Sequence, residues 1–153
     1  AGKWVRSEPI ALPGHSIQCY ISGIFDTVIH LSNGSFGVID FKTSAVKEKN
    51  VAFYSRQLHA YAYALEHPAP GKLSLNPITK LGLLVFEPSD LHQEQDQLYY
   101  SGRIAWQECP IDKEAFLAFL DKVYTVLEMP EAPEADEKCQ FCAYREKARN
   151  TRF

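Results

Sequence analysis

Two charged side chains share one face of an apolar strand in the first third of the chain. Residues 37–44 have the sequence GVIDFKTS, whose β-branched and aromatic residues predict a buried strand. Side chains alternate along a strand, so Asp40 and Lys42 lie on one face, while Phe41 points to the other face and into the core. An isolated Asp-x-Lys pair is most often a surface ion pair. A chemical role therefore requires further residues beside it.

A second acid is predicted to reach the same face from the preceding strand. The segment SNGS at residues 32–35 is typical of a hairpin turn. The apolar residues of the two strands share one face only if the numbers of paired residues sum to an even value. These apolar residues are Phe25, Ile29, Leu31, Ile39 and Phe41. A two-residue turn at Asn33-Gly34 gives an odd sum, so we expect a three-residue loop or a bulge. In that register Asp26 lies opposite or near Asp40, on the face that carries Lys42.

Two carboxylates and one ammonium group on one sheet face suit a hard divalent cation. Mg²⁺ prefers a few carboxylate oxygens and keeps several waters, one of which can act as a nucleophile. Such a metal polarises a phosphoryl oxygen and lowers the pKa of bound water, and a lysine can orient that water. The backbone carbonyl of Phe41 is a further candidate ligand. These residues together are suited to the hydrolysis of a phosphodiester bond.

The rest of the chain predicts a mixed sheet with helices packed beside it. Strand patterns occur at residues 3–13, 16–31, 36–41, 78–88 and 98–108, and a polar loop is expected at 89–97. Apolar residues recur at helical spacing in residues 50–67 and 111–129, which predicts two amphipathic helices. The order βββαββα indicates an α/β fold with a mixed central β-sheet flanked by helices.

Residues 1–129 are expected to form the folded core, and residues 130–153 a C-terminal extension. The acidic, proline-broken linker PEAPEADEK precedes a tail that contains Cys139 and Cys142. The basic residues of the chain are concentrated in this tail, at Arg145, Lys147, Arg149 and Arg152. These side chains could contact phosphates, or they could form the solvated face of a helix or a frayed terminus.

Composition sets further limits on the class of protein. The 153 residues are 46% hydrophobic, enough for one domain with its own core. The formal net charge of −3 is not that of a strongly basic nucleic-acid-binding protein, so any such contact must come from a local patch or a metal. No apolar run approaches about 18 residues and no secretory leader is evident, so we expect no membrane association, a cytoplasmic location and reduced thiols. The start AGKWV, without Met, suggests a domain cut from a longer protein.

Three short motifs that occur in order resemble the PD-(D/E)XK nuclease superfamily. They are SGIFD at 22–26, VIDFKTS at 38–44 and RQLHAYAYAL at 56–65. The matching residues are Gly23 and Asp26, then Asp40, Lys42 and Thr43, then Gln57 and Tyr61. In particular, the pattern resembles the RecB-like branch, which includes RecB/AddB-type and CRISPR-associated RecB-like exonucleases. Each motif is weak by itself, but the ordered set at close spacing is fairly specific.

The resemblance implies a restriction-endonuclease-like fold and a metal-dependent nuclease. Asp26 and Asp40 would bind Mg²⁺ or Mn²⁺ together with the Phe41 carbonyl, and Lys42 would be the catalytic lysine. The substrate would be DNA, either single-stranded or at duplex ends, cleaved by an exonuclease or end-processing activity in repair, recombination or defence. A helicase or a larger nuclease complex is the implied partner. The choice of DNA rests on the resemblance and not on the charge of the chain.

The resemblance also implies roles for Gln57 and Tyr61, which lie four residues apart on one face of a helix. They would flank the site and contact the DNA backbone or the water network. Core packing explains Tyr61 nearly as well, because it belongs to the apolar stripe, whereas Gln57 would otherwise be a surface residue. Glu8 matches a glutamate often present in the corresponding strand of such nucleases, but it is a weak candidate for the site.

Two departures from the family pattern bear on activity. Many RecB-like nucleases carry a histidine on an upstream helix, and this chain begins too late to show one. His15 falls in a predicted turn and His30 at a solvent-facing strand position, so neither takes its place. A missing histidine ligand would weaken metal binding.

The second departure concerns the cysteines. The motif CQFC resembles the iron–sulfur staple of some RecB-like nucleases, which needs four thiolates. Ala148 stands where the third cysteine would fall, so the set is incomplete and an iron–sulfur cluster is not expected. Cys139 and Cys142 are interpreted as a remnant or as reduced thiols, although they could bind zinc with Cys19 or Cys109.

Two other classes of protein fit part of the sequence. A non-catalytic nuclease-fold module would bind DNA or a protein partner, and the missing histidine and low net charge favour it. The intact set of Asp26, Asp40 and Lys42 argues against it, because buried charges without a task are costly. A cysteine-based zinc or redox protein is the other alternative, which a metal analysis without zinc or iron would exclude.

Overall fold

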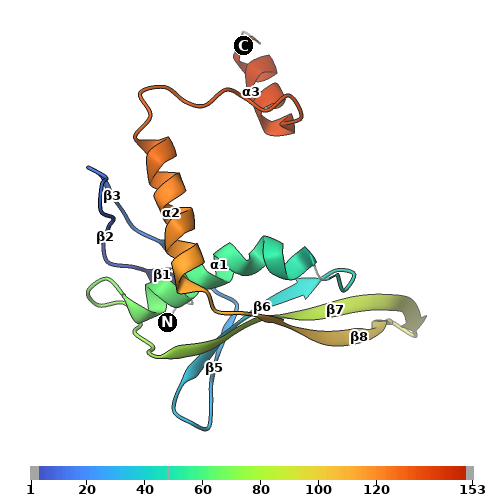
Figure 1. Cartoon of the computed structure of the whole chain (residues 1–153). Helices are drawn as coiled ribbons and strands as arrows, with labels where there is room; N and C mark the ends of the chain where they lie inside the picture. The colour runs from blue at the N-terminus through green and yellow to red at the C-terminus, as the bar shows by residue number, and fades with distance from the viewer. Residues whose placement is uncertain (1–3, 48, 151–153) are drawn as a thin grey trace.

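Four strands form the central sheet of the computed structural model, which describes residues 4–47 and 49–150 (Figure 1). They are β5 (Thr27–His30), β6 (Phe36–Thr43), β7 (Ile78–Glu94) and β8 (Gln97–Cys109). Their order in the sheet follows the sequence; β6 and β7 run parallel, whereas the two outer pairs are antiparallel. Helix α1 (Lys49–Glu66) makes the crossover that parallel neighbours require. The predicted α/β fold with a mixed central sheet is confirmed.

The N-terminal segment forms two small antiparallel pairs instead of the two long strands expected. β1 (Trp4–Arg6) pairs with β4 (Ser22–Ile24), and β2 (Ile10–Ala11) pairs with β3 (Gln18–Cys19). The predicted strands at 3–13 and 16–31 are thus each interrupted, and residue 3 lies outside the described residues. Pro9 lacks the amide hydrogen that a ladder needs, which explains the break between β1 and β2.

The β5–β6 hairpin has the register that the apolar pattern predicts. Val28 pairs with Val38 and His30 with Phe36, so the paired numbers sum to an even value. The Leu31 amide donates a hydrogen bond to the Ser35 carbonyl at 2.8 Å, which leaves a three-residue loop at 32–34. Gly34 has a φ of 83°, a conformation that glycine adopts without strain. The expected three-residue loop is confirmed.

The core lies between α1 and the face of the sheet that α1 covers. Alternate residues of β6 and β7 reach this face, and the apolar stripe of α1 packs on them. The fully buried residues include Val38, Leu58, Leu65, Leu81, Leu83 and Val85. This arrangement places Asp40, two residues after Val38, on the buried face of the sheet rather than on an exposed one.

The expectation that Phe41 faces the core is wrong. Phe41 is 49% exposed, whereas Asp40 is 3% exposed. The strand β6 carries apolar residues on both faces, so its sequence alone does not say which face α1 covers. Phe25 is also misplaced by the prediction: the chain bends between β4 and β5, and Phe25 turns into the core, away from Ile39 and Phe41. Among the described helices, none covers the face that carries Phe41.

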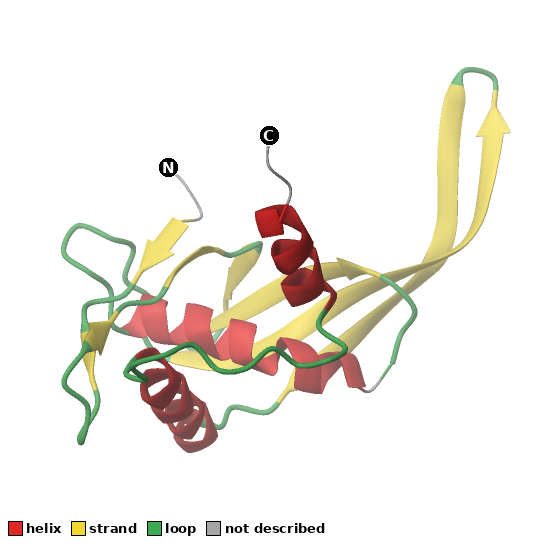
Figure 2. Ribbon diagram, turned by 90° about the horizontal axis from the view of Figure 1, so that it is seen from above, coloured by secondary structure: helices red, strands yellow, loops and turns green. Residues whose placement is uncertain are grey.

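The polar segment at 89–97 is mostly strand, which corrects the predicted loop. β7 and β8 continue past the sheet as a two-stranded arm, seen extending from the body of the molecule in Figure 2. Its turn includes Gln95, which has a φ of 55°. Both faces of such an arm meet solvent, so a polar sequence is compatible with strand pairing there.

Helix α2 (Lys113–Leu127) follows the sheet, and α3 (Gln140–Asn150) ends the described chain. Asp112 caps α2 by accepting a hydrogen bond from the Ala115 amide at 2.8 Å. Figure 1 shows α3 beyond the far end of α2, after an extended connection. Arg152 of the basic tail lies outside the described residues. Within the described chain, no helix is both long and apolar enough to cross a membrane.

Candidate active site

Asp26 stands where the chain turns from β4 into β5. Its Oδ2 accepts a hydrogen bond from the backbone amide of Phe41 at 2.8 Å. The β5–β6 ladder ends at the pair Thr27 and Ile39, so Asp26 occupies the next position and continues the pairing through its side chain. Extending the register places Asp26 across from Asp40, as the sequence predicts.

Asp40 is a buried acid whose charge is poorly compensated. Burial raises the pKa of its carboxyl group, the Lys42 ammonium partly offsets this, and Asp26 adds a smaller upward contribution. Among the described residues, no group donates a hydrogen bond of ordinary geometry to its buried Oδ2, although the Lys42 ammonium lies against it as an ion pair. Perturbed, incompletely satisfied carboxylates of this kind occur preferentially at functional sites.

Lys42 is held beside Asp40 by α1. Its Nζ forms the ion pair with Asp40 and lies 4.3 Å from the centroid of the Tyr54 ring. A cation over an aromatic face is attracted by the ring, so Tyr54 helps to fix the ammonium group. In the sequence, Tyr54 is one of the apolar residues at helical spacing within residues 50–67, a pattern that predicts packing and no chemical role. Its position three residues before Gln57, on the same side of the helix, is the signal that could have identified it.

Gln57 and Tyr61 lie together beside the strand that leads to Asp26. The Gln57 side-chain amide donates a hydrogen bond to the Tyr61 hydroxyl at 2.9 Å. The Tyr61 ring packs on Gly23 so closely that a Cβ at Gly23 would lie 2.8 Å from a ring carbon. The glycine of the SGIFD motif therefore allows α1 to approach β4, three residues before Asp26.

The residues at this site suit a small, hard divalent cation that prefers oxygen ligands. Asp26 and Asp40 supply two carboxylates, and Mg²⁺ is commonly bound through one or two carboxylates and several waters. A strand residue directs its N–H and C=O toward the same edge, so the Phe41 carbonyl faces the edge where Asp26 accepts the Phe41 amide. Residues 4–47 and 49–150 contain no group of three or more His, Cys, Asp or Glu side chains that could hold a metal. Asp26, Asp40 and the Phe41 carbonyl would leave several positions around such a cation to water.

The histidines and Glu8 lie away from this site. His15 contacts Glu128 and Asp121 of the α2 segment, at 2.7 and 3.0 Å. His30 is exposed near the opposite end of β5 from Asp26, as expected. Glu8 approaches His67 just after the end of α1, with 3.9 Å between the charged groups. The structure therefore brings Asp26, Asp40, Lys42, Gln57 and Tyr61 into one region and leaves Glu8 out of it.

None of the four cysteines is in a disulfide, and only Cys139 and Cys142 lie close together in the chain. Cys19 is on β3 and Cys109 is buried at the end of β8. Cys139 and Cys142 lie at the start of α3, where the Cys142 amide contacts the Cys139 sulfur at 3.3 Å. Hydrogen bonds from Cys142, foremost from its side chain, lower the pKa of the Cys139 thiol.

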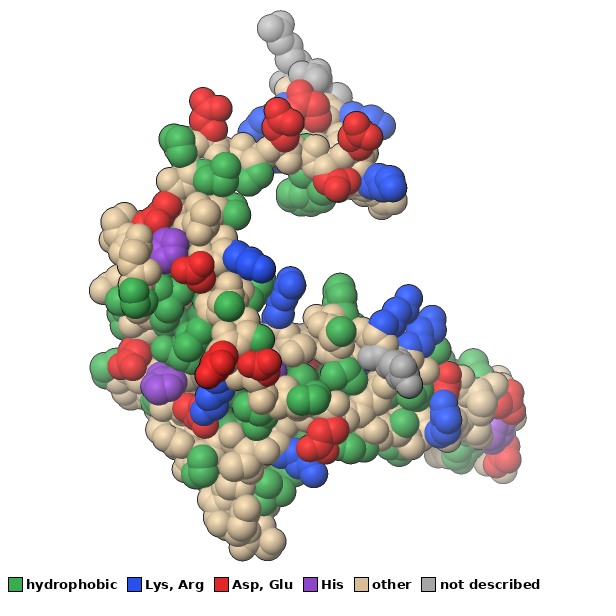
Figure 3. Space-filling model, in the orientation of Figure 1, with side chains coloured by type: hydrophobic (Ala, Val, Ile, Leu, Met, Phe, Trp, Pro, Cys, Tyr) green, Lys and Arg blue, Asp and Glu red, His purple; other side chains and the backbone are tan. Residues whose placement is uncertain are grey.

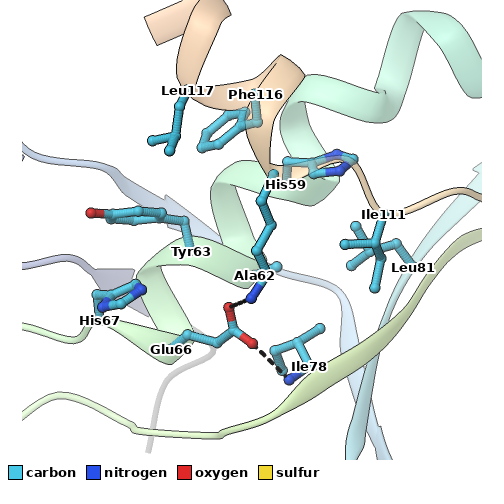
Figure 4. Close-up of a pocket in the computed structure, with 11 residues that line it drawn as sticks. His59, Ala62, Tyr63, Glu66, His67, Ile78, Leu81, Ile111, Phe116 and Leu117 are labelled. Carbon is cyan, nitrogen blue, oxygen red and sulfur yellow. Dashed lines mark hydrogen bonds and ion pairs between the residues drawn. The ribbon is translucent and has the colours of Figure 1, made fainter. Parts of the chain in front are cut away.

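A cavity of about 130 Å³ between α1, α2 and β7 is lined by neither Asp26 nor Asp40 (Figure 4). Its lining is mainly apolar, and the two oppositely charged groups that line it are paired with each other. Glu66 accepts hydrogen bonds from the Lys113 ammonium at 2.7 Å and from the Ile78 amide at 2.9 Å. This cavity belongs to the packing of the helices on the sheet.

The sequence as a whole agrees with the fold and the site. A sequence model of the PD-(D/E)XK nuclease superfamily matches residues 3–147, and the chain belongs to this superfamily. Comparison with curated proteins gave no match. Among solved structures, the chain is similar to the crystal structure of SSO0001, with a TM-score of 0.52 and 21% sequence identity. That similarity covers 93% of this chain but 57% of the other, so the chain spans little more than half the length of this structural relative. At this identity the likeness supports the restriction-endonuclease-like fold alone.

Proposed function

We propose that the chain is a Mg²⁺- or Mn²⁺-dependent deoxyribonuclease whose centre is formed by Asp26, Asp40 and Lys42. The observation that supports the proposal is that these three side chains lie close together at the end of the β5–β6 ladder, where Lys42 pairs with Asp40 and Asp26 is near enough to affect the Asp40 pKa. Membership of a nuclease superfamily supports the reaction class, and the choice of DNA extends it.

The protein groups have separate tasks in this proposal. Asp26 and Asp40 would hold the cation together with the Phe41 carbonyl, and such a cation would supply Lewis-acid activation of water and of the phosphate. The Lys42 ammonium orients the attacking water and offsets charge that develops on the phosphate. Its contact with the Tyr54 ring, at 4.3 Å from the ring centroid, would help to keep the ammonium group in place.

Gln57 and Tyr61 are proposed to position the scissile strand. Their mutual hydrogen bond fixes both side chains at the side of the site nearest β4. An amide and a phenol can each donate to a phosphate oxygen. Their loss should therefore weaken substrate positioning more than metal binding.

The finer assignment follows the motif pattern. We propose that residues 1–129 form a RecB-like nuclease core and that residues 130–153 are an extension. The proposed substrates are single-stranded DNA or duplex ends, cleaved by an exonuclease or end-processing activity. The proposed setting is repair, recombination or defence. A helicase or larger nuclease complex is the proposed partner, and a cytoplasmic location is proposed with it.

A non-catalytic nuclease-fold module is the second candidate. The ion pair between Lys42 and Asp40 favours it, because the Lys42 ammonium partly offsets the buried Asp40 charge without a metal. Such a module would bind nucleic acid or a protein partner with the same affinity in the presence and absence of Mg²⁺.

A cleavage assay separates the two candidates. The purified chain is incubated with end-labelled single-stranded and duplex DNA in Mg²⁺, Mn²⁺ or EDTA. The nuclease proposal predicts cleavage in either metal, none in EDTA, and none by Asp26→Ala. Binding without cleavage in both metals would favour the non-catalytic module.

A further inference from the structure

A groove between α1 and α2 lies outside the Asp26, Asp40 and Lys42 site. Its volume is about 390 Å³, within the range of small-ligand pockets (~300–1,000 Å³). Residues 52–59 of α1 and residues 112–122 at the start of α2 form its walls. In the space-filling view, Lys and Arg side chains project into the hollow beside α2 (Figure 3).

Two cations without acidic partners border this groove. Arg56 and Lys122 both line it and are exposed, and neither forms an ion pair within the described part of the chain. The Arg56 guanidinium lies 4.3 Å from the centroid of the Phe119 ring, so it is held at the rim. The one carboxylate of the lining, Asp112, accepts the Ala115 amide as the cap of α2. The groove is therefore suited to an anion.

The histidine in the groove is not a ligand for that anion. His59 Nδ1 donates to the Ser55 carbonyl at 2.8 Å, and its Nε2 accepts the Asp112 amide at 2.9 Å. Both ring nitrogens are thus occupied, and this pattern requires the neutral imidazole. The binding charge comes from Arg56 and Lys122.

Two aromatic side chains of α1, Tyr54 and Phe53, lie around the helix between the candidate active site and the side that carries Arg56. Tyr54, whose ring carries the Lys42 ammonium, meets Phe53 edge to face with 5.0 Å between centroids. Each helical residue advances about 100°, so Phe53 lies between Tyr54 and Arg56 around the helix. Phe53 is 76% exposed, so its ring is accessible to a ligand.

We propose that this surface binds the single-stranded DNA that extends from the scissile bond. A base stacks on Phe53, and the following phosphates are held by Arg56 and Lys122. Stacking on an aromatic side chain combined with cations along the backbone is how proteins hold single strands without sequence preference. Crossing a helix of about 10–12 Å diameter corresponds to a few nucleotides of strand. The inference rests on the proposed nuclease function, because that function supplies the strand.

Binding of fluorescent ten-nucleotide oligothymidylate in EDTA, measured by anisotropy at several salt concentrations, tests this surface without cleavage. Arg56→Gln and Lys122→Gln should each weaken binding and reduce the slope of log K against log salt by about 0.7. Phe53→Ala should weaken binding by roughly fivefold to a hundredfold, with the slope unchanged. Lys138→Gln is the control, since it removes one exposed positive charge from a position outside the groove, and Lys80→Gln removes one from the sheet face opposite α1, where Lys80 is paired with Glu108.

The outcomes are distinct from those of the cleavage assay. Unchanged affinity and slope in the Arg56→Gln/Lys122→Gln double variant would refute the proposal that the groove binds single-stranded DNA. An equal loss of affinity in Lys138→Gln or Lys80→Gln, or no binding by the wild-type chain, would refute it as well. If the wild type still cleaves DNA in Mg²⁺ under any of these results, the nuclease proposal stands without the groove. Binding that depends on the groove, with no cleavage in either metal, would refute the nuclease proposal alone. Thermal melting of each variant verifies that it is folded.

Discussion

The Asp26 carboxylate accepts the backbone amide of Phe41 at 2.8 Å and thereby closes the end of the β5–β6 ladder. One side chain thus takes the place of a backbone partner at the position where the two strands separate. The Asp40 carboxylate and the Lys42 ammonium lie on the α1 side of the sheet, where Asp40 is buried and Lys42 lies against the Tyr54 ring of α1. The same hydrogen bond fixes Asp26 relative to both groups.

Replacing Asp40 with asparagine should stabilise the fold while removing activity. The raised pKa of Asp40 means that burial and Asp26 disfavour its charge more than Lys42 favours it. Asp40→Asn removes this charge with little change in shape, so its melting temperature at neutral pH should exceed that of the wild type by a few degrees. Added Mg²⁺ should raise the melting temperature of the wild type only. A lower melting temperature for Asp40→Asn would show that the Lys42 ion pair dominates.

Metal affinity should increase with pH through the acidic range. A folded-state pKa above the ordinary aspartate value makes the neutral Asp40 the favoured form at low pH, and a cation must displace that proton. The stability contribution of Asp40 has the opposite trend: it is present below the unfolded pKa and is lost as pH rises through the folded pKa. Titrating Mn²⁺ into the chain by calorimetry at several pH values checks the affinity. A pH-independent affinity would contradict an ionised Asp40 as a ligand.

Gly23→Ala should destabilise the protein through a clash with Tyr61. The new Cβ would lie 2.8 Å from a ring carbon, and the hydroxyl of that ring is held by Gln57. Overpacking of this kind costs about 1–3 kcal/mol. Urea unfolding measures the loss, and the same change in a Tyr61→Ala background should cost much less. Equal losses in the two backgrounds would mean that Gly23 is required for another reason.

The contact between His15 and Glu128 should make stability depend on pH. Hydrogen bonds, foremost from His15, lower the pKa of Glu128 to about 2, and Glu128 and Asp121 raise the pKa of His15. The Glu128 contribution is present above the ordinary glutamate pKa and is lost as pH falls toward about 2. The His15 contribution is present below the ordinary histidine pKa and is lost as pH rises through its raised value.

Both contributions therefore coincide in mildly acidic solution. The difference in melting temperature between wild type and Glu128→Gln should be largest near pH 5–6 and smaller at pH 8. Glu131→Gln, an exposed position close by, serves as the control and should show no such maximum. A constant difference across pH would indicate that Glu128 acts only through the backbone amides of Ser16 and Ile17.

The hairpin register and the meeting of Asp26 with Asp40 were predictable from the sequence. Side-chain alternation and the match of apolar residues were sufficient, since a register slip by one residue would have moved every side chain to the other face. The face that α1 covers was not predictable in this way, because Val38 and Ile39 are both apolar and point in opposite directions. The polarity of residues 89–97 likewise suggested a loop, although a two-stranded arm in solvent tolerates the same composition. Tyr54 was missed because packing explained it without the Lys42 contact.

The single-turnover rate of DNA cleavage by Lys42→Ala, compared with wild type in Mg²⁺, tests the central claim most directly. Lys42 orients the water and offsets phosphate charge in this account, so its loss should reduce the rate by roughly 10²–10³-fold. Lys80→Ala, on the opposite face of the sheet, should cleave at the wild-type rate. Cleavage by Lys42→Ala within about threefold of the wild-type rate, with the same Mg²⁺ requirement, would contradict the assignment of the Asp26, Asp40 and Lys42 site as the catalytic centre.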